Sequence, residues 1–355
     1  MKIFIPTAAE CKLATIYDGC VAAFRKHNGD KGVSWVSDPN SADIIILFEE
    51  WDTRFWQHSK TLKSDPFFRV YWNRIFTINC DDLGRGFLPG CYTSLNKSNF
   101  EPQLHRACAY PYTYNQFVAS SSSREYRASK WLFSFRGTDA SNPIRRKLFR
   151  YFATDPRAKL VRTLTQFHSH SVKEKQEYVD DILLSKFALC PRGWSPTTYR
   201  LFEVMELGCC PVIISDDWIP IDGVPWDQCC VVIKERDLPY CADILTQQEP
   251  NAERLGRAAR DVWEAHFSEP RKFRAMLESI LELWGRSSGD WHDYRERWSS
   301  WRFHYSNEWL PHQRLARRIG RELDAIQNSL CSGLRTLYRQ ADPGSAMTKQ
   351  SGRGS

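Results

Sequence analysis

Two arginines and a glutamate stand at spacings that suit an anionic ligand. Arg192 follows an apolar segment, and Arg200 and Glu203 come next, three residues apart. On a helix this spacing puts Arg200 and Glu203 on one face. Guanidinium groups bind phosphate through charge-assisted, bidentate hydrogen bonds, and a carboxylate can accept hydrogen bonds from ribose hydroxyls. The spacing alone equally allows a surface ion pair between Arg200 and Glu203, which would contribute little.

The elements that would position these residues follow one another without long gaps. The sequence predicts a strand over Lys186–Cys190, a helix over Thr197–Leu207 and a second strand over Cys210–Ile214. Ser195 is expected to cap the helix, with Pro196 as its first residue. In such a βαβ unit the amino end of the helix lies at the carboxyl edge of the sheet, where free N–H groups favour phosphate.

The same alternation of strands and helices runs through the chain. Apolar segments at Lys2–Pro6, Asp43–Phe48 and Arg74–Asn79 predict strands of a first sheet, and Lys130–Phe135 restarts the pattern. This favours an α/β fold with two doubly wound, Rossmann-like domains facing across a cleft, followed by C-terminal helices. The expected parts are an N-terminal domain 1–125, a second domain 126–285, a helical segment 286–340 and a disordered tail 341–355.

Composition narrows the class of protein. The chain has 355 residues, a formal charge of +7, 42% hydrophobic and 26% charged residues, which is typical of globular proteins and excludes collagen-like and disordered chains. None of the 12 cysteines is separated from another by two residues, so zinc-ribbon spacing is missing, and reduced core thiols are expected. With neither a signal peptide nor an apolar run of ~20 residues, the expected location is cytoplasmic.

The segment after Asp290 interleaves tryptophans with arginines, among them Trp291, Trp298 and Arg302. A helix folded back over the domains, attachment to an anionic membrane surface and a nucleic-acid surface all fit this pattern. A membrane surface is an expected peripheral partner of this segment. Nucleic acid is not expected, because the basic residues are spread along the chain and not concentrated on one face or tail.

The segment around the arginines resembles the C-terminal half of the exostosin domain, glycosyltransferase family 47. The resemblance rests on Cys190-Pro191-Arg192-Gly193, on Arg200-Leu201-Phe202-Glu203 and on Gly208-Cys209-Cys210-Pro211-Val212. A second similar block is Phe135-Arg136-Gly137, followed by Arg145-Arg146-Lys147-Leu148. Val204 stands where the family usually has alanine.

This resemblance implies a GT-B enzyme that transfers a sugar with inversion from a nucleotide-sugar, expected to be a UDP-sugar, to a hydroxyl of a glycan or other acceptor. It implies no metal cofactor, and no two aspartates are two residues apart, as a metal-binding Asp-x-Asp motif would need. A non-catalytic glycan- or nucleotide-sugar-binding relative and a membrane-surface binding protein are the alternatives. The donor-binding residues that it implies are Arg136, Gly137, Arg145, Arg192, Gly193, Ser195, Thr198, Arg200 and Glu203.

The transfer also needs a base to accept the proton of the acceptor hydroxyl. Acidic residues that follow strands of the first domain are the candidates, with Asp82 preferred over Glu49 and Glu50. Each could instead be a solvated acid at the end of a strand. His168 and His170 are expected to be surface residues and not metal ligands.

Overall fold

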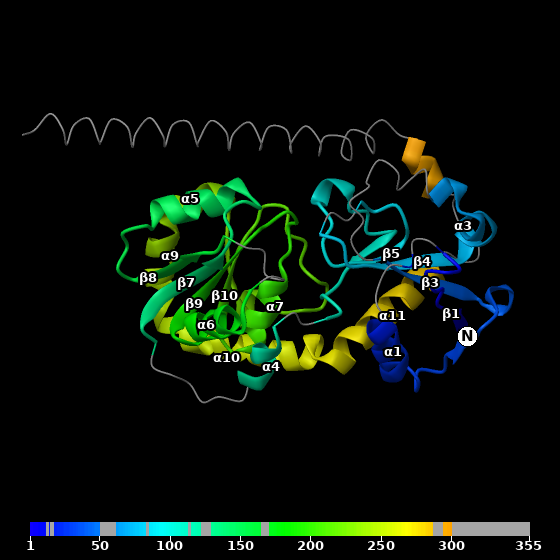
Figure 1. The fold of residues 1–355 in the computed structure, drawn as a ribbon, viewed down its shortest axis with the longest axis horizontal. Helices are drawn as coiled ribbons and strands as arrows, with labels where there is room; N and C mark the ends of the chain where they lie inside the picture. The colour runs from blue at the N-terminus through cyan, green and yellow to red at the C-terminus, as the bar shows by residue number, and fades with distance from the viewer. Residues whose placement is uncertain are drawn as a thin grey trace, which may run out of the picture. The chain divides into compact units, whose positions relative to one another are not determined.

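The computed structural model describes residues 1–11, 14, 18–49, 62–82, 85–112, 115–121, 129–164, 170–286 and 294–299. The chain divides into a unit of residues 1–300 and a unit of residues 301–355, and the second unit lies outside the described residues. Figure 1 shows the first unit with its two sheets. None of the described helices is long and apolar enough to cross a bilayer.

The first sheet contains six parallel strands in the order β2-β1-β3-β4-β5-β6. At its centre β3 is an unbroken apolar run, because both of its faces are covered and every residue in it is buried. The strands are β1 (Lys2–Phe4), β2 (Ser34–Trp35), β3 (Ile44–Glu49), β4 (Ile75–Asn79), β5 (Gly90–Tyr92) and β6 (His105–Ala107).

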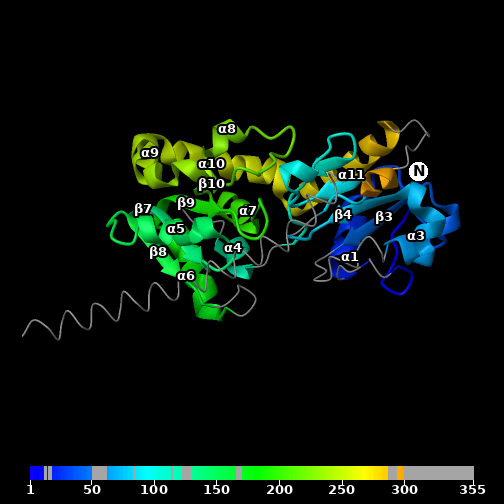
Figure 2. The ribbon, with the colours of Figure 1, turned by 90° about the horizontal axis from the view of Figure 1, so that it is seen from above.

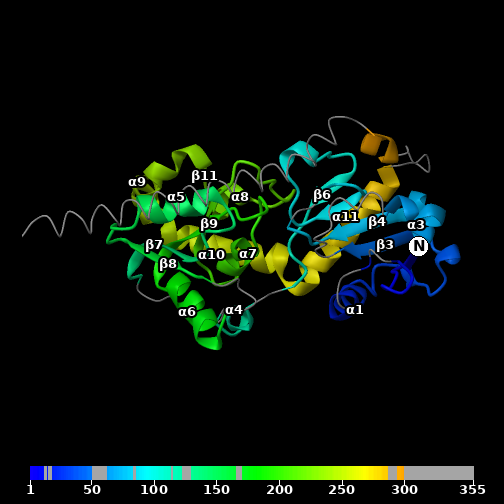
Figure 3. The same cartoon turned by 45° about the horizontal axis from the view of Figure 1, so that its top comes forward.

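Two helices from opposite ends of the described chain cover one face of this sheet. Phe24 of α1 (Asp18–His27) and Phe273 of α11 (Glu269–Arg286) pack edge to face in the same buried cluster as the strands. Figure 3 shows α11 beside α1 along the sheet. The chain therefore returns to the first sheet after completing the second.

The second sheet contains five parallel strands in the order β11-β10-β9-β7-β8. Two apolar clusters hold it from its two faces: α5 and α9 contribute to one, α6 and α7 to the other, and α10 to both. Figure 1 shows α5 and α6 on opposite sides of the strands, and Figure 2 shows the same elements from above. The elements are β7 (Trp131–Gly137), α5 (Pro143–Tyr151), β8 (Ala158–Arg162), α6 (Val172–Leu183), β9 (Ser185–Pro191), α7 (Tyr199–Glu206), β10 (Cys210–Ile214), β11 (Val231–Ile233), α9 (Cys241–Gln248) and α10 (Ala252–Val262).

Shorter elements complete the described part of the unit. They include α3 (Pro66–Tyr71), α4 (Gln116–Ser121), α8 (Trp226–Cys229), the π-helical turn η7 (Trp263–Phe267) and the 3-10 helix η8 (Tyr294–Ser299). Trp298 of η8 is buried and donates a hydrogen bond from its indole Nε1 to the carbonyl of Phe87. The 11 cysteines in the described ranges are all buried and reduced, as expected for core thiols.

The predicted α/β class with two Rossmann-like sheets is confirmed by these two parallel sheets. The predicted cap of α7 is wrong. Thr198 caps the helix, its hydroxyl accepting from the N–H of Arg200, while the Ser195 hydroxyl donates to the carbonyl of Thr197. The helix therefore begins at Tyr199, three residues later than Pro196. The predicted domain boundaries at 125 and 285 stay predictions.

Candidate functional site

Two arginine side chains, of Arg145 and Arg200, lie over the ring of Phe135 on β7. Phe135 and Gly137 lie on the same face of the strand, since side chains alternate along it. The guanidinium of Arg200 lies 4.5 Å from the centre of the Phe135 ring, and that of Arg145 lies 5.5 Å from it. Glycine at 137 leaves room for this arrangement, because a Cβ there would come within 3.1 Å of Nη2 of Arg200. The sequence predicts both arginines as site residues, and the structure brings them together.

Backbone carbonyls hold the Arg145 side chain. Its Nε donates to the carbonyl of Arg192 at 3.1 Å, and its Nη2 donates to the carbonyl of Pro191 at 3.1 Å. Burial and then the neighbouring charge of Arg200 together lower the pKa of Arg145 to about 10. Carbonyl groups are neutral, so hydrogen bonds to them leave the positive charge of a buried guanidinium available to an anion.

Arg200 is fixed in a similar way. Its Nη2 donates to the carbonyl of Arg136 at 2.6 Å, and its guanidinium lies between the rings of Phe135 and Tyr178. Its buried Nε has no hydrogen-bond partner in the described part of the chain. Neither Arg200 nor Arg145 forms an ion pair with any described carboxylate. Two adjacent buried cations that form no ion pair with a described carboxylate suit the binding of a diphosphate.

Glu203 lies one turn further along α7. The Tyr178 hydroxyl donates to its Oε2 at 2.7 Å, and its buried Oε1 has no partner in the described ranges. Burial raises the pKa of Glu203 to about 7, although the Tyr178 hydrogen bond and the charge of Arg200 oppose this rise. Glu203 therefore offers one free acceptor atom beside the two arginines.

The other two predicted arginines have their charges compensated. Nη1 of Arg192 lies 2.7 Å from a carboxylate oxygen of Asp217 and 3.5 Å from one of Glu235. Arg136 points to the opposite face of β7 from Phe135, where its Nε lies 2.7 Å from Asp181. A second carboxylate, of Glu177, lies 3.0 Å from Nη1 of Arg136. Their predicted contact with a donor stays a prediction.

Two buried serine hydroxyls at the carboxyl edge of the second sheet were not anticipated from sequence. The Oγ atoms of Ser141 and Ser215 have no partner within the described residues. Ser141 precedes the cap of α5 and its Oγ lies near Gly193, where a Cβ would come within 3.6 Å of it. Ser215 follows β10, so its place after a parallel strand is a signal that could have identified it.

Asp82 of the first sheet lies beside the loop that precedes α7. Its Oδ1 accepts from the Tyr110 hydroxyl at 3.1 Å and lies 3.3 Å from Oγ of Ser195, whose one hydrogen is shared with the closer carbonyl of Thr197. The contact with Ser195 spans the two sheets, and the negative charge of Asp82 acts on Arg145. The structure therefore brings the preferred base candidate to the same site as the arginines.

The other base candidates differ from Asp82. Glu49 is buried at the end of β3, and its Oε2 accepts from the Thr77 hydroxyl at 2.7 Å and from the Asn79 amide at 2.9 Å. Glu50 and His168 lie outside the described residues. No group of three or more His, Cys, Asp or Glu side chains in the described ranges is arranged to hold a metal ion.

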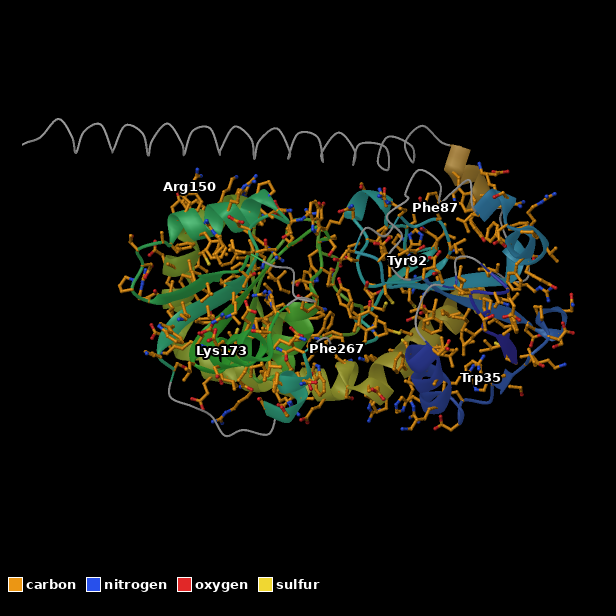
Figure 4. The ribbon with its side chains drawn as sticks, in the orientation of Figure 1. Trp35, Phe87, Tyr92, Arg150, Lys173 and Phe267 are labelled. Carbon is orange, nitrogen blue, oxygen red and sulfur yellow. The ribbon has the colours of Figure 1, made fainter. Side chains whose placement is uncertain are left out.

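Residues from both sheets line a small pocket next to the Asp82–Ser195 contact. Tyr92, which is labelled in Figure 4, and Phe100 come from the first sheet and its loops. Thr197, Phe202 and Trp218 come from the second. This pocket is therefore lined by residues from both sheets and their loops, and it includes Thr197, whose carbonyl accepts from Ser195.

The amino-acid sequence of this chain is similar to those of known proteins. The model of the Exostosin GT47 domain matches residues 55–248, more than half of the 355 residues. The rice protein "Probable glucuronosyltransferase GUT1" is 28% identical over 252 residues, which is 59% of this chain and 60% of that protein. The Arabidopsis thaliana protein "Probable beta-1,4-xylosyltransferase IRX10L" is 42% identical over 82 residues, 22% of this chain and 20% of that protein. The chain thus spans 60% or less of these relatives.

Similar solved structures include an α1,3-fucosyltransferase, with 12% identity, a TM-score of 0.42 and coverage of 82% of this chain and 92% of the other. A glycosyltransferase from Rickettsia africae has 8% identity and a TM-score of 0.41, with coverage of 80% and 98%. The matched residues include all of β7, with Phe135, and all of α7. Because the family model matches more than half of its residues, this chain belongs to the exostosin GT47 family.

Proposed function

We propose that this chain is an inverting glycosyltransferase that moves a sugar from a UDP-sugar to a hydroxyl of a glycan or other acceptor, without a metal ion. The observation that carries the proposal is the pair of buried guanidinium groups of Arg145 and Arg200 over Phe135, without a carboxylate partner in the described chain. Membership of the exostosin GT47 family supports it.

The arginines would stabilise the leaving group. When the bond between the sugar and the diphosphate breaks, negative charge develops on the diphosphate, and preorganised donors in a buried site stabilise that charge most. Arg145 and Arg200 are preorganised, because backbone carbonyls and rings already hold them. They would supply the positive charge that a divalent cation supplies elsewhere. Oε1 of Glu203 would accept a hydrogen bond from a ribose hydroxyl.

Asp82 would act as the base. Inversion in one displacement needs the acceptor hydroxyl on the face of the sugar opposite the leaving group. Asp82 comes from the first sheet and the arginines from the second, so a sugar between them would have the two groups on opposite sides. Asp82 would accept the proton of the hydroxyl as the new bond forms.

The names of the relatives suggest the sugars to try. Relatives are named as xylosyl- and glucuronosyltransferases. We therefore propose UDP-xylose and UDP-glucuronic acid as first candidates. A cytoplasmic location and membrane contact through the basic, aromatic helical segment predicted over 286–340 also remain proposals, and of that segment the structure describes only residues 286 and 294–299.

A thermal-shift panel tests the donor site, because a ligand that binds the folded chain raises its unfolding temperature. UDP, UDP-xylose and UDP-glucuronic acid are compared with ADP and GDP, with and without a chelator. We expect stabilisation by uridine compounds that survives the chelator and is lost in Arg200→Ala. Arg150→Ala on the exposed face of α5 is the matched control and should keep the shift. An unchanged shift in Arg200→Ala would refute the assignment.

A further inference from the structure

Tyr178 of α6 contacts two residues of the candidate donor site. Its hydroxyl donates to Oε2 of Glu203 at 2.7 Å, and the guanidinium of Arg200 lies 5.2 Å from the centre of its ring. Tyr178 is 9% exposed. Figure 4 labels Lys173 in the first turn of the same helix. One buried tyrosine therefore reaches both the cation and the carboxylate that α7 presents.

Two ion pairs hold α6 beside β7. Nε of Arg136 lies 2.7 Å from Asp181, and its Nη1 lies 3.0 Å from Glu177. Along the helix, Glu177 directly precedes Tyr178 and Asp181 follows three residues later. The backbone carbonyl of Arg136 accepts from Nη2 of Arg200 at 2.6 Å. Because the side chain of Arg136 holds α6 and its carbonyl holds Arg200, the position of Tyr178 relative to Arg200 is fixed.

The ring of Tyr178 restricts the Arg200 side chain. Two rings lie close to the guanidinium, that of Phe135 at 4.5 Å and that of Tyr178 at 5.2 Å. A free arginine side chain has many rotamers, and contact with two rings and a carbonyl leaves few of them. A diphosphate that binds to Arg200 would then find the charge in place, which reduces the entropy lost on binding.

The hydroxyl of Tyr178 acts on Glu203 in two ways. It occupies Oε2, while the buried Oε1 has no partner in the described ranges. It also favours the ionised carboxylate, because a hydrogen bond to the charged form stabilises that form. Burial raises the pKa of Glu203 to about 7, and the Tyr178 bond is the largest of the effects that oppose this rise. Burial also raises the pKa of Tyr178 well above its usual range, so the hydroxyl keeps the proton that it donates.

Other charged or titratable groups lie near Glu203 on its own helix and on neighbouring elements. They are Tyr199, Arg200 and Glu206 of α7, Cys190 of β9, Lys272 of α11, and Tyr110 and Tyr112 of the segment after β6. The backbone N–H of Asn115 also lowers the pKa of Glu203. Within the described part of the chain, Tyr178 is the side chain that donates a hydrogen bond to the Glu203 carboxylate.

We propose that Tyr178 is a positioning residue of the donor site: its ring holds Arg200 for the diphosphate, and its hydroxyl holds Glu203 ionised with Oε1 left for a ribose hydroxyl. The roles toward the donor rest on the proposed function. The action of the hydroxyl on Glu203 is a property of the ligand-free chain and can be measured without a donor.

Tyr178→Phe separates the two roles, because it removes the hydroxyl and keeps the ring. The midpoint of the pH dependence of UDP binding should move upward by about one unit. UDP affinity should then fall roughly fivefold at pH 7 and hardly at all at pH 9, where Glu203 is mostly ionised with or without the hydroxyl. In the Glu203→Gln background the same substitution should leave the pH dependence unchanged.

Tyr178→Leu removes the ring as well. Arg200 then keeps the Phe135 ring alone, so UDP affinity should fall by a further factor of roughly 3 to 30 at every pH from 6 to 9, as expected for loss of a buried cation–π contact. A loss no larger than that of Tyr178→Phe would overturn the role of the ring.

Chemical denaturation without ligand between pH 5 and 9 tests the hydroxyl by itself. The folded chain keeps a proton on Glu203 up to about pH 7, so stability falls as the pH rises toward that value. In Tyr178→Phe this fall should extend about one pH unit higher. Tyr71→Phe is the matched control, because Tyr71 is also 9% exposed and its hydroxyl donates to Oδ1 of Asn40 at 2.9 Å. It should lower stability equally at every pH.

The two measurements fail independently. A stability profile of Tyr178→Phe with the same midpoint as that of the unmodified chain would overturn the inference, whether or not UDP binds. If the unmodified chain does not bind UDP, the proposed function is wrong, and the denaturation profile still decides whether Tyr178 sets the charge of Glu203.

Discussion

The carboxyl edges of the two sheets carry opposite charge in opposite settings. At the second sheet, Arg145 and Arg200 are buried and held by backbone carbonyls. At the first sheet, Asp82 is exposed and lies within hydrogen-bond distance of two hydroxyl groups, those of Tyr110 and Ser195. A fixed, desolvated charge suits a group that must stabilise charge without moving, and an accessible carboxylate suits a group that must exchange a proton with a bound hydroxyl.

Two buried arginines of the second sheet also differ from each other in their ion-pair partners. Arg136 and Arg145 are both buried and both belong to the resembling motifs, but Arg136 is paired with Asp181 and Glu177, and Arg145 has no carboxylate partner in the described chain. The motif therefore contains an arginine that stabilises the fold and another that is available to a ligand. The predictions below test this division of roles, beginning with the largest expected effect.

Asp82→Asn should abolish most of the transfer and leave donor binding in place. Loss of a general base typically costs about 10²–10⁴-fold in rate. Steady-state kinetics with the donor identified by thermal shift would show a fall in kcat, while the UDP affinity changes less than about twofold. Glu49→Gln is the comparison, because Glu49 is bonded to Thr77 and Asn79 and its loss should lower stability instead. A kcat that survives Asp82→Asn would move the base elsewhere.

Arg145→Ala should mainly lower UDP affinity, and Arg136→Ala should mainly lower stability. Arg145→Ala removes a charged hydrogen-bond donor worth about 1.5–3 kcal/mol, so UDP affinity should fall by roughly 10- to 100-fold, with a smaller loss of stability than Arg136→Ala because no buried carboxylate loses its ion-pair partner. Arg136→Ala leaves the buried Asp181 without its partner and should cost about 3–5 kcal/mol of folding free energy. Calorimetric titration with UDP and chemical denaturation distinguish them. Equal effects of both variants on UDP affinity would contradict the division.

Sequence predicted this division only in part. The βαβ unit from Lys186 to Ile214 is clear in sequence, because buried parallel strands are unbroken apolar runs and its helix has an apolar face. Strands β5 and β6 were missed, since three residues each carry no periodicity and only neighbouring strands hold them in place.

The site shows the same limit. The motifs nominate Arg145 and Arg200 by residue type, but Tyr178, which bonds Glu203 and stacks on Arg200, lies on another helix. No spacing in the sequence relates the two. The cap at Thr198 was missed because Ser195-Pro196 matches the usual pattern, and only the fold gives the Ser195 hydroxyl the Thr197 carbonyl and Asp82 as partners.

Donor binding should depend on pH through Glu203. Its pKa is about 7, and only the ionised form accepts freely from a ribose hydroxyl. UDP affinity should therefore weaken as the pH falls from 8 to 6, by up to about 10-fold per pH unit below the midpoint. Glu203→Gln should flatten this dependence. A pH profile that is equally steep in that variant would assign the titration to another group.

The stability of the ligand-free chain should depend on the protonation of Glu203 in the opposite direction to UDP affinity. An exposed glutamate in the unfolded chain titrates near its ordinary pKa of 4.5, and the folded chain holds the proton until about pH 7. The folded form binds more protons between these values, so stability falls as the pH rises from about 4.5 to 7 and is level above. Glu203→Gln should remove this fall in ligand-free denaturation.

The smallest effect is expected at Ser141. Its buried Oγ has no partner in the described chain and lies near Gly193, at the edge that carries Arg145. If it donates to the diphosphate, Ser141→Ala should weaken UDP binding by about 1 kcal/mol, roughly fivefold, and should raise stability slightly, because an unsatisfied buried hydroxyl is removed. Ser121→Ala, at another buried hydroxyl on α4, is the matched control for stability without an effect on UDP. A loss of stability in Ser141→Ala with unchanged UDP affinity would give Ser141 a structural role in the second sheet. The residues proposed to contact the donor would then be Arg145, Arg200 and Glu203.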